Sequence, residues 1–163
     1  MAPMNAKRTC ASLDLLKRPL TLQGADESSP GAKLGVNVVF TSAKATLAAL
    51  KTARRLATDL QASINVVWLC AVPYSLPLDR PPVSVPFIEQ QLLELSNQGV
   101  QGPWETNILL ILCRDERQAL LQALGPRSLV VIGSQSRWWP ARENGLAKVL
   151  RSHGHQVIFV RSR

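Results

Sequence analysis

The chain has 163 residues, which is long enough for one domain with a buried core. Hydrophobic residues make up 46% and charged residues 18%, so the composition excludes a wholly disordered chain. The formal net charge of +8 permits nucleic acid, anionic membranes or acidic ligands as partners. No run of lysine and arginine exceeds two residues and no nucleic-acid-binding module is recognisable, so nucleic acid is not the expected partner.

The start of the chain lacks the apolar segment of a secretory signal, and the longest apolar stretch, 64–72, is too short to span a bilayer. We therefore expect a cytoplasmic protein without a membrane span. Three cysteines, at 10, 70 and 113, do not make a disulfide framework in a chain of this length. Cys70 and Cys113 end two neighbouring predicted strands, so they are interpreted either as a redox switch or as buried free thiols.

Residues 1–33 are predicted to be a flexible N-terminal extension, followed by a folded domain at 34–163. The stretch 24–31 has the composition of turns and linkers and no periodic apolar face. Five leucines between 13 and 22 suggest an alternative, in which a short segment docks on the domain. Termini are usually mobile, which favours the flexible extension.

The domain alternates apolar runs with helical patterns. The runs are typical of strands buried on both faces, and they cover 36–40, 64–72, 107–113, 129–132 and 157–160. Helices are predicted from apolar periodicity and capping residues at 43–62, 87–98, 115–124 and 146–152. Five prolines between 73 and 86 predict an extended loop. Strict alternation implies an α/β fold with parallel strands, right-handed crossovers and helices on both faces of the sheet.

The stretch 129–145 is predicted to carry half of any ligand site. Its strand stops at Gly133, and a basic, aromatic loop with Arg137, Trp138 and Trp139 follows. In open α/β sheets, ligands bind just past the carboxyl ends of such strands. A tryptophan face could stack on a base, and an arginine could pair with phosphate or carboxylate. The alternative is that the tryptophans cover the core and fill the crevice.

These residues resemble the universal stress protein family over about 34–161. The likeness rests on the alternating strands and helices, the Val-Val-Ile-Gly-Ser strand end at 130–134, and the closing Gly-His-Gln-Val-Ile-Phe-Val at 154–160. It implies a single domain of the adenine nucleotide alpha hydrolase type, with a five-stranded parallel sheet in the order 3-2-1-4-5. The segments 41–42 and 133–134 would then face each other across a crevice between the first and fourth strands.

The nucleotide-binding branch of that family has an aspartate after the first strand. After the fourth strand it has Gly, two residues, Gly, nine residues, Gly, and Ser or Thr. Here Gly133 matches the first glycine and Gly145 the last. Thr41 takes the place of the aspartate, Ser136 that of the middle glycine and Leu146 that of the hydroxyl residue, and the second spacing is one residue short. We therefore expect no standard ATP binding and no cofactor.

The leading functional prediction is a non-catalytic binding protein of the stress-response type. No catalytic constellation, P-loop or dinucleotide fingerprint is present, and His153 and His155 alone do not make a metal site. The alternative is a nucleotide-binding protein that holds ATP or AMP in the crevice, with Trp138 stacked on the base. The candidate ligand-binding residues are Thr41, Ser42, Gly133, Ser134, Gln135, Arg137, Trp138 and Gly145.

The last strand is predicted to form an edge of the sheet. Its apolar residues Val157, Ile158, Phe159 and Val160 invite pairing with a second copy of the chain. The resemblance also implies dimerisation through this strand, so we expect a homodimer. The alternative is that the N-terminal extension covers this edge.

Overall fold

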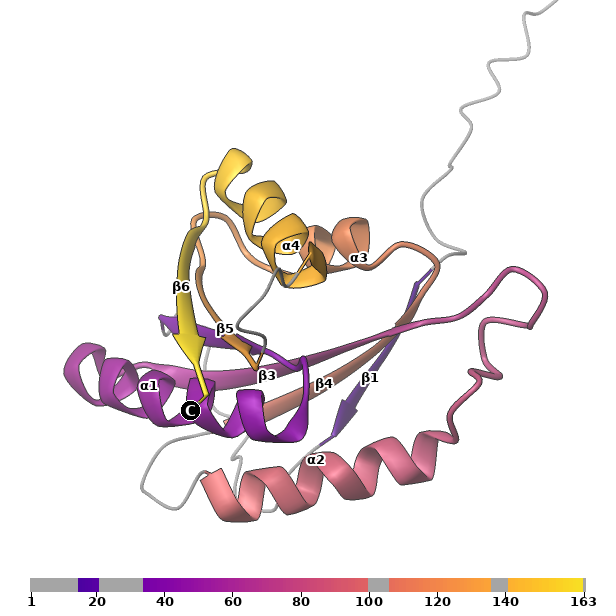
Figure 1. Ribbon diagram of the computed structural model, residues 1–163, viewed down its shortest axis with the longest axis horizontal. Coiled ribbons are helices and arrows are strands. Elements are labelled where there is room, and N and C mark those ends of the chain that lie inside the picture. The colour runs from indigo at the N-terminus through magenta and orange to yellow at the C-terminus, as the bar shows by residue number, and fades with distance from the viewer. Residues whose placement is uncertain (1–14, 21–33, 100–105, 136–140, 163) are drawn as a thin grey trace, which may run out of the picture.

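In a computed structural model, the chain forms one six-stranded sheet between two layers of helices (Figure 1). The structure describes residues 15–20, 34–99, 106–135 and 141–162. The strands are β1 (Leu15–Leu20), β2 (Gly35–Val39), β3 (Ser63–Ala71), β4 (Thr106–Cys113), β5 (Leu129–Ser134) and β6 (Gln156–Arg161). The helices are α1 (Ala43–Leu60), α2 (Val85–Gly99), α3 (Glu116–Ala123) and α4 (Ala141–Ser152).

The five parallel strands follow the order β4-β3-β2-β5-β6, which is the predicted order 3-2-1-4-5. Helices α1 and α2 lie on one face of the sheet, and α3 and α4 on the other (Figure 1). The predicted fold class is therefore confirmed. The direction of the strand order reverses between β2 and β5, so the carboxyl ends of these two strands flank the switch point.

Strand β1 agrees with the alternative interpretation, in which a short segment between 13 and 22 docks on the domain. Residues 15–20 run antiparallel to β4, with Leu15 opposite Cys113 and Leu20 opposite Ile108. The physical reason is that the edge of β4 presents unpaired backbone groups, which this segment hydrogen-bonds. It lies at the sheet edge opposite β6, so these six residues do not cover β6. The rest of 1–33 lies outside the described residues.

The core consists of two apolar layers because strand side chains alternate between the faces of the sheet. On one face, Val38 and Leu110 pack with Leu50 of α1. On the other face, Ile132 packs with Leu146 of α4. Helices cover both faces, which explains why the parallel strands read as nearly continuous apolar runs.

Local capping sets both ends of α1 and the start of α3. Ser42 is the N-cap of α1, and Gln61 ends this helix in the left-handed conformation with φ of 50°. Asp115 caps α3 by accepting hydrogen bonds from two backbone N–H groups of its first turn. Helix α4 begins at Ala141 and not at 146 as predicted. Gly145 therefore lies inside this helix and not before it.

Three asparagines form a hydrogen-bonded row across the sheet. Asn37 of β2, Asn65 of β3 and Asn107 of β4 share one register. Asn65 Nδ2 donates to Asn37 Oδ1 at 3.2 Å, and Asn107 Nδ2 donates to Asn65 Oδ1 at 3.1 Å. Asn37 Nδ2 donates to the carbonyl oxygen of Leu129 in β5 at 3.2 Å. This row joins the amino-terminal parts of four neighbouring strands.

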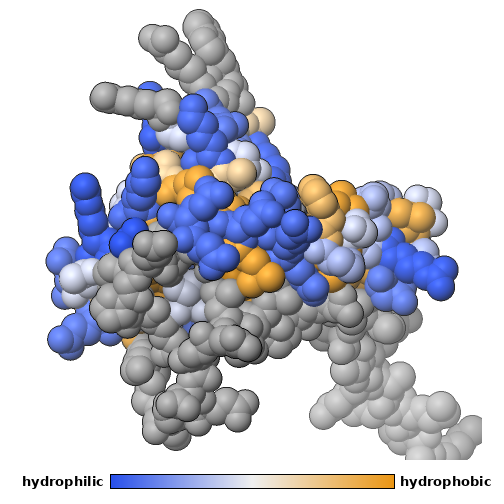
Figure 2. All heavy atoms as spheres, turned by 90° about the horizontal axis from the view of Figure 1, so that it is seen from below, coloured by the Kyte–Doolittle hydropathy of each residue, from blue (hydrophilic) through white to orange (hydrophobic). Residues whose placement is uncertain are grey.

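The solvent side of α1 and α2 is mostly hydrophilic, with smaller hydrophobic areas between the polar side chains (Figure 2). This pattern is typical of helices that pack on a sheet by one apolar stripe. None of the described helices combines the length and the apolar character that a membrane crossing requires.

His155 connects the turn after α4 to the start of β5. The residue is 8% exposed, and its Nδ1 accepts a hydrogen bond from the N–H of Ser128 at 3.1 Å. Burial lowers the pKa of His155 below its ordinary value, and the neighbouring His153 adds to this effect. A protonated ring would place a second donor against the Ser128 N–H, so the neutral ring is the form that fits.

We expect acid to destabilise the protein through His155. The His155 ring binds a proton near pH 6.5 in the unfolded chain and only at lower pH in the folded protein. The contribution of His155 to the free energy of unfolding is therefore complete above pH 6.5, and it is lost as the pH falls through the folded pKa. The slope is at most about 1.4 kcal/mol per pH unit for one proton. Urea unfolding at a series of pH values should show a shallower slope in His155→Gln than in the wild type. The exposed His153→Gln removes only the smaller of the two causes, so its slope should lie between those of the wild type and His155→Gln. Equal slopes in wild type and His155→Gln contradict the prediction.

Candidate ligand-binding crevice

The carboxyl ends of β2 and β5 meet as the sequence predicts. The Thr41 hydroxyl donates to the carbonyl oxygen of Gly133 at 2.8 Å. Ser42 follows Thr41 as the N-cap of α1, and Ser134 ends β5. Four of the predicted site residues thus lie at the ends of two neighbouring strands. Gln135 comes directly after β5 and is exposed.

Strand β5 packs directly against the start of α1 at Gly133. A Cβ atom at this position would lie 2.0 Å from the carbonyl oxygen of Ala45 and 2.5 Å from its carbonyl carbon. No side chain larger than hydrogen fits so close to a backbone carbonyl. Gly133 therefore serves close helix–strand packing, which is one of the roles of glycine in dinucleotide-binding turns. The contact also leaves no space for a ligand group between Gly133 and Ala45.

Three backbone donors around the start of α1 are bonded within the chain. The N–H of Thr41 donates to Thr46 Oγ1 at 3.3 Å, and the N–H of Ala45 donates to Ser42 Oγ at 3.4 Å. The N–H of Thr46 donates to the carbonyl oxygen of Ser42 at 2.8 Å. A phosphate at a helix N-terminus is held by N–H groups of this kind. The N–H groups of Thr41, Ala45 and Thr46 are therefore already engaged within the chain.

Gly145 is not part of a glycine loop at the strand end. It lies in α4, where a Cβ atom would meet the guanidinium Nη2 of Arg117 from α3 at 3.0 Å. The next residue, Leu146, is buried between α4 and the sheet. The structure thus brings Gly145 to the contact between α3 and α4. The remaining candidates, Arg137 and Trp138, lie outside the described residues with Trp139, and their roles stay predictions.

Ser134 has a buried hydroxyl without a partner. The residue is 5% exposed, and its Oγ makes no hydrogen bond to the part of the chain that the structure describes. Alternation along β5 places Ser134 on the same face as Val130 and Ile132, which pack with residues of α4. A buried hydroxyl that has lost water without gaining a partner costs about 1–3 kcal/mol. Such a group is one that a bound ligand could satisfy.

Arg142 and Glu116 form a forked ion pair near Ser134's end of the sheet. Arg142 Nε donates to Glu116 Oε2 at 2.8 Å, and Nη2 donates to Oε1 at 2.6 Å. These hydrogen bonds raise the pKa of Arg142 above its ordinary value. Glu116 comes after β4 in the chain, and Arg142 comes after β5. In the sheet, the two central strands β3 and β2 lie between β4 and β5. The pair therefore bridges the carboxyl ends of the two central strands.

The structure rules out a redox pair between Cys70 and Cys113. Cys113 lies opposite Ala71 in the register, one position past Cys70. The two side chains consequently point to opposite faces of the sheet, and they pack in different core layers. Burial raises the pKa of Cys113 to about 12, and the Glu116 carboxylate contributes to the rise, so the reactive thiolate is suppressed. Both residues are buried free thiols, as the second interpretation predicts.

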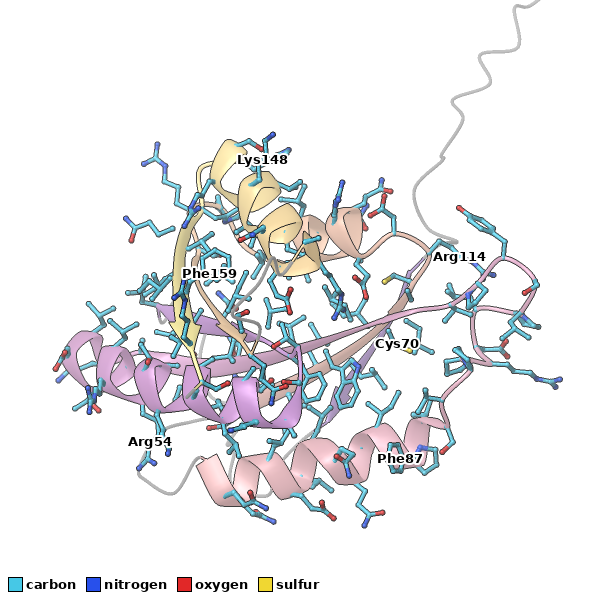
Figure 3. All side chains as sticks on the ribbon, in the orientation of Figure 1. Arg54, Cys70, Phe87, Arg114, Lys148 and Phe159 are labelled. Atoms are coloured by element: carbon cyan, nitrogen blue, oxygen red, sulfur yellow. The ribbon has the colours of Figure 1, made fainter. Side chains whose placement is uncertain are left out.

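Arg114 makes a contact with the proline-rich loop that the sequence pattern does not predict. The Arg114 guanidinium, which follows β4, donates to the carbonyl oxygens of Val72 and Leu76 at 2.8 Å each and also to that of Pro73. It lies 5.0 Å from the ring centroid of Tyr74, whose side chain is 81% exposed. Arg114 thus fixes the start of the loop after β3 (Figure 3).

The groups at the strand ends suit binding and packing more than chemistry. The Thr41 and Ser42 hydroxyls are both engaged in hydrogen bonds, and both histidines lie at the other end of the sheet, where α4 leads into β6. Within the described ranges, no group of three or more His, Cys, Asp or Glu residues could hold a metal ion.

No protein-family model matches the chain, and no curated protein matches its sequence. Among solved structures, the chain is similar to a universal stress protein in complex with cAMP, with a TM-score of 0.48, 14% identity and coverage of 82% of this chain and 100% of that one. It is also similar to a protein of the universal stress protein family from Burkholderia pseudomallei, with a TM-score of 0.44, 19% identity and coverage of 80% and 98%. The order of the parallel strands in this chain is the one that the resemblance implies.

Proposed function

We propose that this protein is a non-catalytic binding protein of the universal stress type, whose central crevice is closed by its own chain and does not bind ATP in the standard manner. The observation that carries the proposal is the close approach of Gly133 to the Ala45 carbonyl, which leaves no space for a Cβ atom. The Thr41 hydroxyl, in the position of the family's aspartate, supports it by donating to Gly133. The proposal assigns no cofactor and places the protein in the cytoplasm.

The second candidate function is binding of ATP or AMP at the same strand ends. The buried, unpartnered hydroxyl of Ser134 favours it, because a ligand oxygen would satisfy this group. Arg137 would pair with the anion and Trp138 would stack on the base. This candidate differs from the first in requiring the adenine moiety for binding.

A melting-temperature screen separates the two functions. A ligand bound only by the folded protein stabilises it, by about 2.7 kcal/mol at a concentration one hundred times its Kd. We expect ATP, AMP and cAMP, each at about 1 mM, to raise the melting temperature by no more than an inorganic polyphosphate that matches the charge of that nucleotide. A larger shift that depends on the adenine moiety contradicts the proposal and supports the second candidate.

The proposal includes a homodimer formed through β6. The N–H of Gln156 donates to the carbonyl oxygen of Ser128, and the N–H of Ser162 donates to that of Ser134, so both groups point toward β5. Because the N–H direction alternates along a strand, the N–H groups of Val157 and Phe159 point away from β5. An antiparallel pair of β6 strands centred on Phe159 would place Arg161 opposite the Val157 of the second copy, because residues with outward N–H groups face each other in such a pair. The pairing therefore brings no two like charges face to face. Phe159 marks this outer strand in Figure 3.

We expect Val157→Pro to convert the dimer to a monomer. Proline removes an N–H group that points away from β5, so it blocks pairing with a second chain and leaves the hydrogen bonds to β5 in place. Val157→Ala is the matched control, because it shortens the same side chain and keeps the N–H group. Sedimentation equilibrium at micromolar concentration measures the result. A monomeric wild type, or equal dimerisation of the two variants, shows the interface to be wrong.

A further inference from the structure

We propose that the edge of β4 is a second self-association surface of this chain, and that β1 is a built-in strand that keeps this surface occupied. When β1 is released, the edge pairs with the β4 edge of a second copy. The inference goes beyond the proposed function, because it concerns the edge of the sheet opposite β6. Figure 1 shows β1 beside β4 at this edge.

The backbone groups of β4 point alternately to its two neighbouring strands. The N–H of Val72, just past β3, donates to the carbonyl oxygen of Cys113 at 2.8 Å, so Cys113 presents its backbone groups to β3. Because the direction alternates along a strand, Ile108, Leu110 and Leu112 present theirs to β1. These three residues are the ones that a strand at this edge hydrogen-bonds.

Strand β1 satisfies this edge and ends the sheet on its own outer side. The register places Leu16, Arg18 and Leu20 opposite those three residues, so their N–H groups point toward β4 and that of Lys17 points away. Pro19 lies at the next outward position, where a missing N–H group breaks no hydrogen bond to β4. Proline and charged residues on an edge strand hinder pairing with a further strand. The outer side of β1 is therefore a protected edge.

Strand β4 has none of these protective features. Its sequence, Thr106–Cys113, contains no charged residue and no proline. The side chains from Leu110 to Cys113 are buried in the two core layers. An apolar edge of this kind is a template for pairing with another chain. The fold therefore depends on β1 to keep this edge closed.

The sheet can release β1 without losing its parallel strands. β1 is six residues long, and β4 is its one neighbour among the described strands. The strands β2 to β6 pair with one another without it. Terminal elements with a single partner open at lower free energy than the core does. Opening of β1 therefore exposes the β4 edge on a sheet that is otherwise complete.

A second copy of β4 fits the exposed edge. An antiparallel pair centred on Leu110 would place Leu110 opposite itself and Ile108 opposite Leu112, and the backbone groups of all three point outward. The pair joins apolar residues and brings no like charges together. Pairing at both β4 and β6 would give an open-ended assembly, so the presence of β1 limits the chain to the proposed dimer.

Arg18→Pro tests the inference in the full chain. It removes the central N–H group that points toward β4, so we expect β1 to leave the edge. Lys17→Pro is the matched control, because it removes the same charge and adds the same ring where the N–H group points away. Both variants are made in the Val157→Pro background, in which pairing through β6 is blocked.

We expect Arg18→Pro to form a dimer at micromolar concentration in sedimentation velocity and Lys17→Pro to stay monomeric. At concentrations below the dimer range, the amides of Leu110 and Leu112 should exchange hydrogen at least about tenfold faster in Arg18→Pro than in Lys17→Pro. An excess of a synthetic peptide of residues 13–22 should return Arg18→Pro to a monomer, because it fills the edge again. The same peptide carrying the Arg18→Pro change should have no effect.

Three results overturn the inference. They are a monomeric Arg18→Pro whose Leu110 and Leu112 amides have lost protection, amide protection equal to that of Lys17→Pro, and equal association of the two variants. If circular dichroism shows that Arg18→Pro does not fold, Leu16→Pro takes its place, since it also removes an N–H group that points toward β4. The proposed function fails on different results, namely adenine-dependent binding or a monomeric wild type, so the two failures are distinguishable.

Discussion

Replacement of Gly133 by alanine is expected to lower the free energy of unfolding by about 3 kcal/mol or more. The added methyl carbon would lie 2.0 Å from the Ala45 carbonyl oxygen, and the contact is to backbone, which cannot move aside like the tip of a long side chain. Either β5 or the first turn of α1 must shift. Urea unfolding followed by circular dichroism measures the loss.

Gly125→Ala is the matched control for this prediction. Gly125 follows α3, and the nearest atom to its added Cβ would be the Ser128 Oγ at 3.9 Å, an ordinary contact. We expect a change within about 1 kcal/mol, because alanine here mainly restricts the unfolded chain. Similar losses of unfolding free energy in the two variants would mean that β5 and α1 are not in close contact. The crevice would then not be closed by the chain.

Asn37→Ala is expected to cost about 2–3 kcal/mol of stability. The Asn37 side chain is buried, and it donates to the carbonyls of Leu129 and Gly35 and accepts from Asn65. Its removal leaves the Asn65 amide without its acceptor in a half-buried site and opens a small cavity between three strands. Chemical denaturation of the wild type and the variant gives the difference.

Asn107→Ala isolates the effect of burial within the same row. Asn107 is exposed and its amide donates to Asn65, so water can replace its amide. We expect a loss of about 1 kcal/mol or less. If Asn107→Ala is as destabilising as Asn37→Ala, the row is not a buried hydrogen-bond network of the kind described.

The parallel strands and the helices between them could be predicted from the hydrophobic pattern, whereas the order of the strands in the sheet followed from the resemblance to the universal stress protein family. Residues 64–72 and 107–113 are apolar without alternation, which indicates burial on both faces, and helical stretches of the right length separate the strands. The strand β1 could not be predicted in this way. It pairs with the free edge of β4, and the local sequence of 15–20 contains no information about an unpaired edge far along the chain.

Other features depend on contacts between residues far apart in the chain. Gly133 reads as the first glycine of a phosphate loop, but its environment is the carbonyl of Ala45, 88 residues earlier by the numbering. The fork between Glu116 and Arg142 likewise joins two helices that follow different strands. Each residue is an ordinary helix-start residue by itself, and only the packing of α3 beside α4 brings them together.

The asparagine row carried a signal that sequence reasoning could have used. An asparagine stands near the start of each of the first three predicted strands, within otherwise apolar runs. A polar residue at a buried strand position needs a hydrogen-bond partner. The parallel order of the strands places Asn37, Asn65 and Asn107 side by side, so the row follows once the order is known.

The central claim is that the chain itself closes the crevice between β2 and β5. An amide nuclear magnetic resonance titration of the labelled protein with ATP tests it directly at the residues concerned. We predict that the amide signals of Thr41, Ala45 and Gly133 keep their positions at millimolar ATP, because their surroundings are already filled by the chain. Saturable shifts of these three signals with ATP, absent with inorganic polyphosphate, would contradict the claim.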